Sequence, residues 1–288
     1  MLYQRHRDGD LSTRLLAQAY KKMGIAAVNV GDRDLSQGLD FLKQEAAQGL
    51  PLISANLVDA VQKKPIFPPY VIREVSGGRI AFVGLLRSPL PPAIEKSLQG
   101  KAAVEDPLEA TRRAVAELKG KADLVVLLSD LGWDQDSRIA REITGIQFIL
   151  GGHEGRATTG PFQQGETFIV QSYQKGMYAG ELALPLEKLG SRFQDEGKIT
   201  RIQEQLNELE RRSRDLQGAK ERNPHLDIKP AIKGIKQQKD KLQKELKEAQ
   251  KTAAQGTRFR WTLEPISTSL AEDAEVRSLI EASGIKQD

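Results

Sequence analysis

Residues 1 to about 190 alternate between short apolar runs and stretches in which apolar residues recur every three to four positions. The short runs predict buried strands, and the three-to-four spacing predicts amphipathic helices. The run 123–128 is almost entirely apolar, which is typical of a strand buried on both faces. We expect strands at 26–30, 52–56, 70–75, 79–86, 123–128, 146–150, 167–172 and 179–186, and helices at 15–23, 39–47, 107–118 and 135–143.

Turn and cap residues separate several of these elements. Ser76-Gly77-Gly78 lies between two predicted strands and indicates a β-hairpin. Asp106 followed by Pro107 is typical of a helix start, with the aspartate as N-cap and the proline at the first helical position. Together, the alternating elements predict an α/β (α+β) fold in which helices cover a mixed sheet and loops lie at strand ends.

Residues 198–254 have a different pattern. Apolar residues keep helical spacing on both sides of a break at Asn223–Asp227, which consists of turn-forming residues. Two amphipathic helices joined by a short turn are expected to pack as an antiparallel helical hairpin, in effect a short coiled coil. One long helix is the alternative, and Pro224 and Pro230 count against it.

The sequence after this region returns to the earlier pattern. Phe259–Leu263 alternates and predicts a strand that rejoins the sheet left by residues 179–186. A short helix is expected at 271–282. The predicted organisation is therefore an α/β domain at 1–190, an inserted helical hairpin at 191–256, and a return strand with a C-terminal helix at 257–288.

Composition excludes several classes of site. The chain has 288 residues, of which 39% are hydrophobic and 28% charged, as in a folded soluble protein. It has no Cys, so disulfides, thiolate metal sites and iron–sulfur clusters are ruled out. Its three His are His6, His153 and His225, too few for a histidine-rich metal centre. No apolar run is long enough to span a membrane, and the first residues do not resemble a secretory signal.

The net charge of +4 is concentrated in the predicted hairpin. Residues 198–254 hold 15 Lys+Arg and 9 Asp+Glu, so the rest of the chain is slightly acidic. Mixed charges on a helix face are usually just solvated, and no aromatic residue interrupts this stretch, which argues against nucleic acid as a partner. We expect the hairpin to bind a protein partner or a second copy, for example as a four-helix bundle. A salt-sensitive nucleic-acid or membrane-surface binder is the weaker alternative.

Three loops that follow predicted strands contain polar side chains suited to chemistry. They carry Asp32 and Asp34, then Asp130, then His153 and Glu154. Ligand sites in α/β proteins form at the carboxyl ends of strands, and carboxylates with one imidazole can hold a hard divalent cation. A purely structural role is the alternative, because aspartate at a strand end often closes a turn or caps a helix.

The order of these loops and the residues around them resembles the calcineurin-like metallophosphoesterase domain of the 5′-nucleotidase family. The resemblance covers roughly residues 14–190. The matching segments are Met23-Gly24-Ile25-Ala26-Ala27, Gly31-Asp32-Arg33-Asp34-Leu35-Ser36, Ser54-Ala55-Asn56, Pro69-Tyr70-Val71-Ile72, Gly77-Gly78, Gly84-Leu85, Leu128-Ser129-Asp130-Leu131-Gly132 and Gly151-Gly152-His153-Glu154-Gly155.

The resemblance implies a partial four-layer αββα sandwich and a site that departs from the family's two-metal centre. Asp32 replaces a ligand Asn, Arg33 replaces the His that assists the leaving group, and Asp130 replaces a ligand His. His153 keeps its ligand position, whereas Gly155 stands where the family has another His. The family's first Asp-x-His motif has no counterpart, through natural loss or a shortened chain. Two-metal phosphoryl transfer needs most of these ligands, so we expect one weakly held cation or none.

Two function hypotheses follow. The first is a metallophosphoesterase-like protein that has lost two-metal hydrolysis and serves in binding or assembly. The alternative is a remodelled phosphate-ester hydrolase that uses one divalent cation, Mn²⁺, Mg²⁺ or Zn²⁺, on Asp32, Asp130 and His153. In the alternative, Arg33 would steady the phosphate as a bidentate donor and Asp34 or Glu154 would position water. Arg33 and Asp34 are then the catalytic candidates, and Gly151, Gly152 and Glu154 are the candidates for substrate binding. The family is mostly exported, which implies an extracytoplasmic, periplasmic location.

Overall fold

A computed structural model gives the fold of residues 9–174, 176–185, 192–252 and 256–283. The chain divides into two units, one formed by residues 1–180 with 263–288 and the other by residues 181–262. His6 and the predicted domain boundary near residue 190 lie outside the described residues. Among the described residues, no helix combines the length and apolarity needed to cross a membrane.

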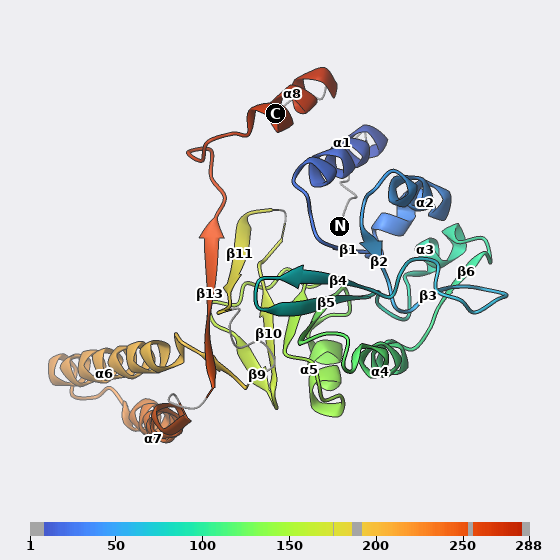
Figure 1. The fold of residues 1–288 in the computed structure, drawn as a ribbon. Helices are drawn as coiled ribbons and strands as arrows, with labels where there is room; N and C mark the ends of the chain where they lie inside the picture. The colour runs from blue at the N-terminus through green and yellow to red at the C-terminus, as the bar shows by residue number, and fades with distance from the viewer. Residues whose placement is uncertain (1–8, 175, 186–191, 253–255, 284–288) are drawn as a thin grey trace. The chain divides into compact units, whose positions relative to one another are not determined.

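The first unit is built on a mixed six-stranded sheet (Figure 1). Its four inner strands run parallel, and an antiparallel strand closes each edge. The strand order is β4 (Tyr70–Val75), β5 (Gly78–Leu85), β7 (Leu124–Ser129), β8 (Phe148–Gly151), β10 (Thr167–Gln171) and β9 (Phe162–Gln164). The hairpin predicted around Ser76-Gly77-Gly78 is confirmed as the β4–β5 pair, in which Val75 lies opposite Gly78.

Two helices cover one face of this sheet: α4 (Pro107–Leu118) and α5 (Trp133–Glu142). Val83 and Leu85 point toward them from β5 and are fully buried. The start of α4 is as predicted, because Asp106 accepts hydrogen bonds from the backbone N–H groups of Leu108 and Glu109.

The other face of the sheet carries a small parallel pair, β1 (Val28–Asn29) and β2 (Leu52–Ile53). Alternation along β5 points Gly84 at this pair, and a Cβ there would lie 2.6 Å from the backbone oxygen of Ile53. A second apolar cluster joins this layer to α1 (Gly9–Lys22) and α2 (Leu39–Ala47). Further short elements are η1 (Asp34–Gln37), α3 (Pro92–Ser97) and the antiparallel pair β3 (Leu57–Asp59) and β6 (Ala102–Val104).

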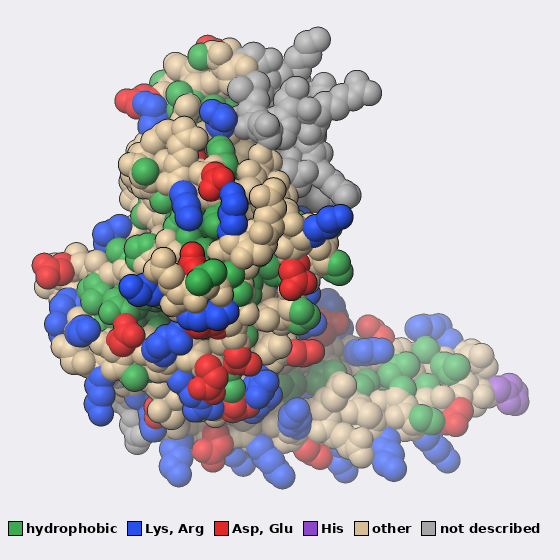
Figure 2. All heavy atoms as spheres, turned by 90° about the vertical axis from the view of Figure 1, so that its right-hand side faces the viewer, with side chains coloured by type: hydrophobic (Ala, Val, Ile, Leu, Met, Phe, Trp, Pro, Cys, Tyr) green, Lys and Arg blue, Asp and Glu red, His purple; other side chains and the backbone are tan. Residues whose placement is uncertain are grey.

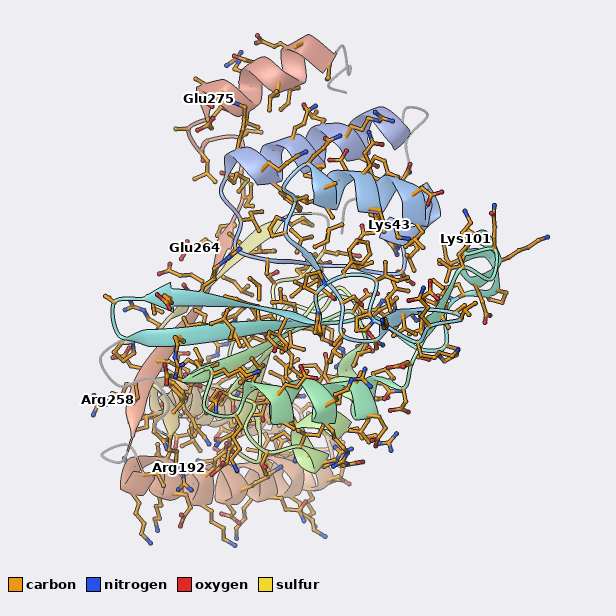
Figure 3. All side chains as sticks on the ribbon, turned by 45° about the vertical axis from the view of Figure 1, so that its right-hand side comes forward. Lys43, Lys101, Arg192, Arg258, Glu264 and Glu275 are labelled. Atoms are coloured by element: carbon orange, nitrogen blue, oxygen red, sulfur yellow. The ribbon has the colours of Figure 1, made fainter. Side chains whose placement is uncertain are left out.

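The C-terminal helix α8 (Ala274–Ser283) contacts α1 within the same unit. The carboxylate of Glu275 on α8 lies 2.6 Å from the amino group of Lys22 at the end of α1; Glu275 is labelled in Figure 3. The helix predicted at 271–282 is therefore present, although it begins three residues later.

The second unit contains two long helices, α6 (Lys198–Arg222) and α7 (Lys229–Thr252). They run antiparallel, since Lys198 pairs with Glu245 near one end and Lys239 pairs with Glu210 further along. Strand β13 (Thr257–Pro265) lies between β11 (Tyr178–Ala183) and β12 (Phe193–Asp195) in a three-stranded sheet, so the predicted return strand rejoins the sheet as expected.

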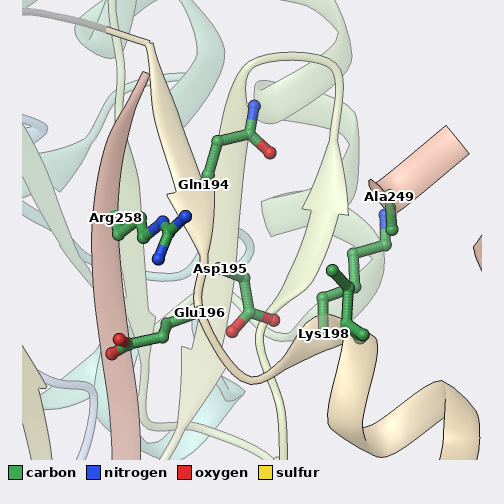
Figure 4. A pocket seen from close by; sticks show the side chains of 7 residues that line it. Gln194, Asp195, Glu196, Lys198, Ala249 and Arg258 are labelled. Carbon is green, nitrogen blue, oxygen red and sulfur yellow. The ribbon is translucent and has the colours of Figure 1, made fainter. Parts of the chain in front are cut away.

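The core of this unit is small and partly aromatic. The rings of Phe193 and Phe259 meet edge to face, with centroids 6.4 Å apart, and both are buried. A pocket of about 120 Å³ lies where the strands meet the helices, lined by Asp195, Lys198 and Arg258 among others (Figure 4). Asp195 is paired with Arg201 of α6, so its charge is already compensated.

Candidate metal centre

The three candidate ligands follow the carboxyl ends of strands β1, β7 and β8 in the first unit. Strand β7 ends at Ser129 and β8 ends at Gly151, and these two residues lie opposite each other in the parallel register. The backbone N–H of Gly152 donates to the carbonyl of Ser129 at 2.9 Å, which keeps the two strand ends together. Asp130 and His153 therefore leave the sheet side by side, and the loop after β1 brings Asp32 to the same place.

Asp32, Asp130 and His153 form a compact cluster. One ligand atom from each lies within 4.8 Å of the others. Asp32 and Asp130 are only 5% and 6% exposed, and His153 is half-buried. Asp130 orders the cluster because its Oδ2 accepts the backbone N–H of Asp32 at 2.8 Å, while its Oδ1 lies 3.2 Å from His153 Nδ1. The three predicted metal ligands are thus brought together.

Arg87 is a member of the site that sequence reasoning missed. It follows β5 by two residues, and its Nη1 lies 3.0 Å from His153 Nε2 and 3.7 Å from Asp32 Oδ2. A search for oxygen and imidazole ligands has no reason to select an arginine. The signal available in the sequence was its place just after the buried strand 79–86, the same kind of position that the ligands occupy.

The cluster fits one divalent cation. Two buried carboxylates with one guanidinium nearby leave negative charge in a site where burial makes charge costly. Asp32 Oδ1 is buried and has no hydrogen-bond partner. The hydrogen bond to Asp130 raises the pKa of His153 above its ordinary value, while burial and Arg87 oppose that rise. Two carboxylates and an imidazole suit Mn²⁺ or Zn²⁺, and a bound cation would satisfy the unpartnered oxygen.

The remaining predicted site residues occupy different positions around the cluster. Asp34 is buried, and its Oδ2 accepts the backbone N–H of Gly31 at 2.8 Å, so it holds the loop that carries Asp32. The neighbouring Arg33 is exposed. Glu154 accepts the backbone N–H of Trp133 at 3.1 Å and pairs with Arg156 at 3.0 Å.

Gly151 and Gly152 form the backbone between β8 and His153. A Cβ on Gly151 would lie 2.7 Å from Gln171 Nε2 and 2.9 Å from Asp136 Oδ2, so a larger residue there would have to push these two buried side chains aside. At Gly152 the nearest atom would be 3.8 Å away, which leaves room on that side. The substrate-binding roles expected of these two glycines remain predictions.

A buried acid supports the loop that carries Asp130. Asp136 on α5 accepts a 2.5 Å hydrogen bond from the hydroxyl of Ser129, which in turn accepts the backbone N–H of Leu131. Burial raises the pKa of Asp136 to about 7, and the nearby charges of Glu154 and Asp130 add to the rise. Asp136 was not predicted from the sequence, because a charged residue in a helix is expected to lie on the surface unless the packing is known.

A cavity of about 470 Å³ adjoins the cluster. Asp130 and Asn29 contribute polar atoms, whereas Ile25, Val28 and Leu150 contribute apolar walls. Its lining is thus a mixture of polar and apolar groups, which is typical of sites for small organic ligands.

The chain is similar in sequence to curated nucleotidases. The chain is 30% identical over 171 residues to a 2′,3′-cyclic-nucleotide 2′-phosphodiesterase/3′-nucleotidase of Salmonella typhimurium, which covers 51% of this chain and 26% of the relative. It is 29% identical over 191 residues to a 5′-nucleotidase of Vibrio cholerae, which covers 55% of this chain and 34% of the relative. The chain is a homologue of the 5′-nucleotidases. It spans about a quarter to a third of the length of these two relatives.

A solved structure gives the fold of this nucleotidase homologue. The calcineurin-like phosphoesterase YfkN of Bacillus subtilis superposes with a TM-score of 0.62 at 14% identity, over 98% of this chain and 80% of that one. The predicted mixed α/β, calcineurin-like metallophosphoesterase fold and the family resemblance are therefore confirmed. No protein-family model matches the chain.

Proposed function

We propose that this nucleotidase homologue holds one divalent cation on Asp32, Asp130 and His153 and uses it to bind a phosphate-bearing ligand, without two-metal hydrolysis. The observation that carries the proposal is the cluster itself, in which two buried carboxylates and an imidazole lie within 4.8 Å of one another beside a cavity. Three side-chain ligands suit one ion whose remaining positions are open to water or ligand oxygens.

The arrangement does not favour a second ion. Two-metal phosphoryl transfer requires cations about 3.5–4 Å apart that share ligands. Among the described residues, no further group of three ligands is present.

Metal content and turnover test the proposal together. The protein is incubated with Mn²⁺, desalted and assayed for metal by mass spectrometry, and then assayed for hydrolysis of bis(p-nitrophenyl) phosphate. We expect one ion per chain, loss of the ion in Asp32→Asn and His153→Ala, and hydrolysis at background. Two ions per chain, or metal-dependent turnover, would contradict the proposal. Glu281→Gln on the exposed α8 is the matched charge control and should keep the ion.

A single-metal phosphate-ester hydrolase is the second candidate, and the adjoining cavity favours it because the organic part of an ester would fit there. A bound divalent cation lowers the pKa of a water ligand and so supplies a nucleophile. Exposed Arg33 would bind the phosphate oxygens, and Asp34 or Glu154 would orient water. Metal-dependent turnover that is lost in Asp32→Ala and in His153→Ala would establish this hydrolase function.

The helix pair α6–α7 is proposed as the surface for a protein partner or a second copy. Apolar side chains along the pair, including Leu209, Leu242 and Leu246, are only half-buried. Figure 2 shows hydrophobic side chains along the pair, bordered by Lys and Arg. We expect Leu209→Lys with Leu246→Lys to lower the sedimentation coefficient of a self-associated protein. An unchanged coefficient, together with unchanged capture of partners, would rule out this surface.

The relatedness to 5′-nucleotidases also supports a proposed extracytoplasmic location. Fractionation of cells that make the native protein tests it. Recovery with the cytoplasm would contradict it.

A further inference from the structure

The backbone at Arg87 is held in place next to the cluster of candidate ligands. The preceding residue, Leu86, is fully buried, and both its backbone groups bond to the buried amide of Asn56: Leu86 N–H donates to Asn56 Oδ1 at 2.9 Å, and Asn56 Nδ2 donates to the Leu86 carbonyl at 2.7 Å. The Arg87 side chain is 34% exposed. The fold therefore holds the backbone at Arg87 in place, whereas its partly exposed guanidinium end can move.

One nitrogen of Arg87 contacts two of the three candidate ligands. Nη1 lies 3.0 Å from His153 Nε2 and 3.7 Å from Asp32 Oδ2. Because a guanidinium can only donate, the contact requires Nε2 to present its lone pair. The other ring nitrogen, Nδ1, faces Asp130 Oδ1 at 3.2 Å. Neutral His153 then donates from Nδ1 and accepts at Nε2.

A metal ion needs that same lone pair and the same carboxylate. A neutral imidazole has one nitrogen lone pair, so a cation that binds either ring nitrogen takes the lone pair that Arg87 contacts. A cation on Nε2 displaces the guanidinium directly, whereas a cation on Nδ1 leaves the proton on Nε2, which then cannot accept from Arg87. At Asp32, Arg87 lies near Oδ2 and leaves Oδ1 without a partner, so there the two cations compete for the negative charge of the carboxylate rather than for one oxygen atom. Arg87 and a divalent cation therefore compete for His153 and Asp32.

We propose that Arg87 is an internal competitor of the divalent cation: its guanidinium supplies the positive charge when no metal is bound, and it must leave the cluster for the metal to bind. This inference rests on the metal site of the proposed function. It predicts that the wild-type protein binds metal weakly because each binding event must displace a cation. It also means that a bound metal frees a guanidinium next to the site, where it can face a ligand phosphate.

Calorimetric titration with Mn²⁺ tests the competition without any assay of activity. Arg87→Gln removes the charge and keeps a polar but shorter side chain, and it should bind Mn²⁺ at least tenfold more tightly than the wild type. Arg87→Lys keeps the charge and should bind closer to the wild-type affinity. Arg112→Gln on α4, exposed and outside the site, removes one positive charge elsewhere and should change the affinity less than twofold. Thermal unfolding of each variant shows whether it is folded.

The outcomes separate this inference from the proposed function. Equal affinities of the wild type and Arg87→Gln would overturn the inference and leave the metal site standing. Weaker binding by Arg87→Gln would show that Arg87 supports the metal, and would also overturn it. If neither protein nor Arg87→Lys binds Mn²⁺, both the inference and the metal site are wrong. Binding by Arg87→Gln with none by the wild type would support the inference in its strongest form.

Discussion

Asp136 is a buried acid whose protonation depends on the fold. Its Oδ1 accepts from Ser129, its Oδ2 is buried without a partner, and burial raises its pKa from 3.8 to about 7. Between these two values the folded protein binds a proton that the unfolded chain has released. Stability therefore falls as pH rises from about 4 to about 7, and the loss is complete above the folded pKa.

The substitution Asp136→Asn should remove this pH dependence. At about pH 3, where Asp136 is protonated in both the folded and the unfolded wild type, the variant and the wild type should have similar free energies of unfolding. At pH 8 the variant should be the more stable, by an amount on the order of 4 kcal/mol at about 1.4 kcal/mol per pKa unit. Urea unfolding at both pH values measures the difference. His153 titrates in the same direction, so only the difference between the two proteins isolates Asp136. A variant that is less stable at pH 8 would contradict the account.

Candidate site residues could be predicted from the sequence where they directly follow a predicted strand. Asp32, Asp130 and His153 each follow a recognisable apolar strand, so the strand-end rule found all three. Arg87 and Asp136 were not found. Arg87 belongs to the site because of the side chains that it contacts, and Asp136 belongs to it because helix α5 places it in the interior. Both facts depend on tertiary packing, which the local sequence pattern does not show.

At the scale of elements, Gly84 marks the closest approach between two layers of the first unit. A Cβ on this residue would lie 2.6 Å from both Asn29 Oδ1 and the backbone oxygen of Ile53. The backbone oxygen cannot move aside cheaply, because β1 and β2 hold each other in register.

We therefore expect Gly84→Ala to destabilise the protein by about 1–3 kcal/mol through overpacking. Because β1 leads into the loop that holds Asp32, the same variant should also weaken metal binding. Gly234→Ala on α7 is the matched control: no atom lies within 4 Å of its Cβ position, so the change should stabilise its helix by up to about 1 kcal/mol. Chemical denaturation measures both. Equal stability of Gly84→Ala and the wild type would show that the layers are less tightly packed than described.

Long, strongly patterned elements were predicted well, and short ones were not. The apolar strand at 123–128 became β7, and the helix at 107–118 has the predicted start and end. Of the strand expected at 52–56, only Leu52–Ile53 forms a strand, β2, and the next strand, β3, begins after it at Leu57 in a different sheet. Elements of three residues, such as β6, β9 and β12, have too few positions for a period to show. Tertiary pairing, rather than local pattern, creates them.

At the scale of the whole molecule, the strand order of the main sheet could not be derived from the sequence, because pairing between distant strands depends on packing across the whole unit. The division of charge could be derived. The surplus of Lys+Arg lies in residues 198–254, whereas the candidate metal centre lies among acidic residues of the first unit. We therefore expect the two units to respond differently to a cation.

Hydrogen exchange measured by mass spectrometry should show that difference. Saturating Mn²⁺ at 100 times its Kd stabilises the state that binds it by about 2.7 kcal/mol. Protection should rise in peptides that cover the three loops around 31–34, 129–132 and 151–155. Peptides from α6 and α7 should not change. Equal protection in both units, or protection confined to the helix pair, would place the cation elsewhere.

The most direct measurement is a crystal structure of the protein grown with Mn²⁺, with anomalous scattering used to locate the metal. The account predicts one anomalous peak bounded by Asp32, Asp130 and His153, with the guanidinium of Arg87 displaced from Nε2 of His153. A crystal with no peak at these residues, or with two peaks bridged as in a two-metal phosphoesterase, would contradict it.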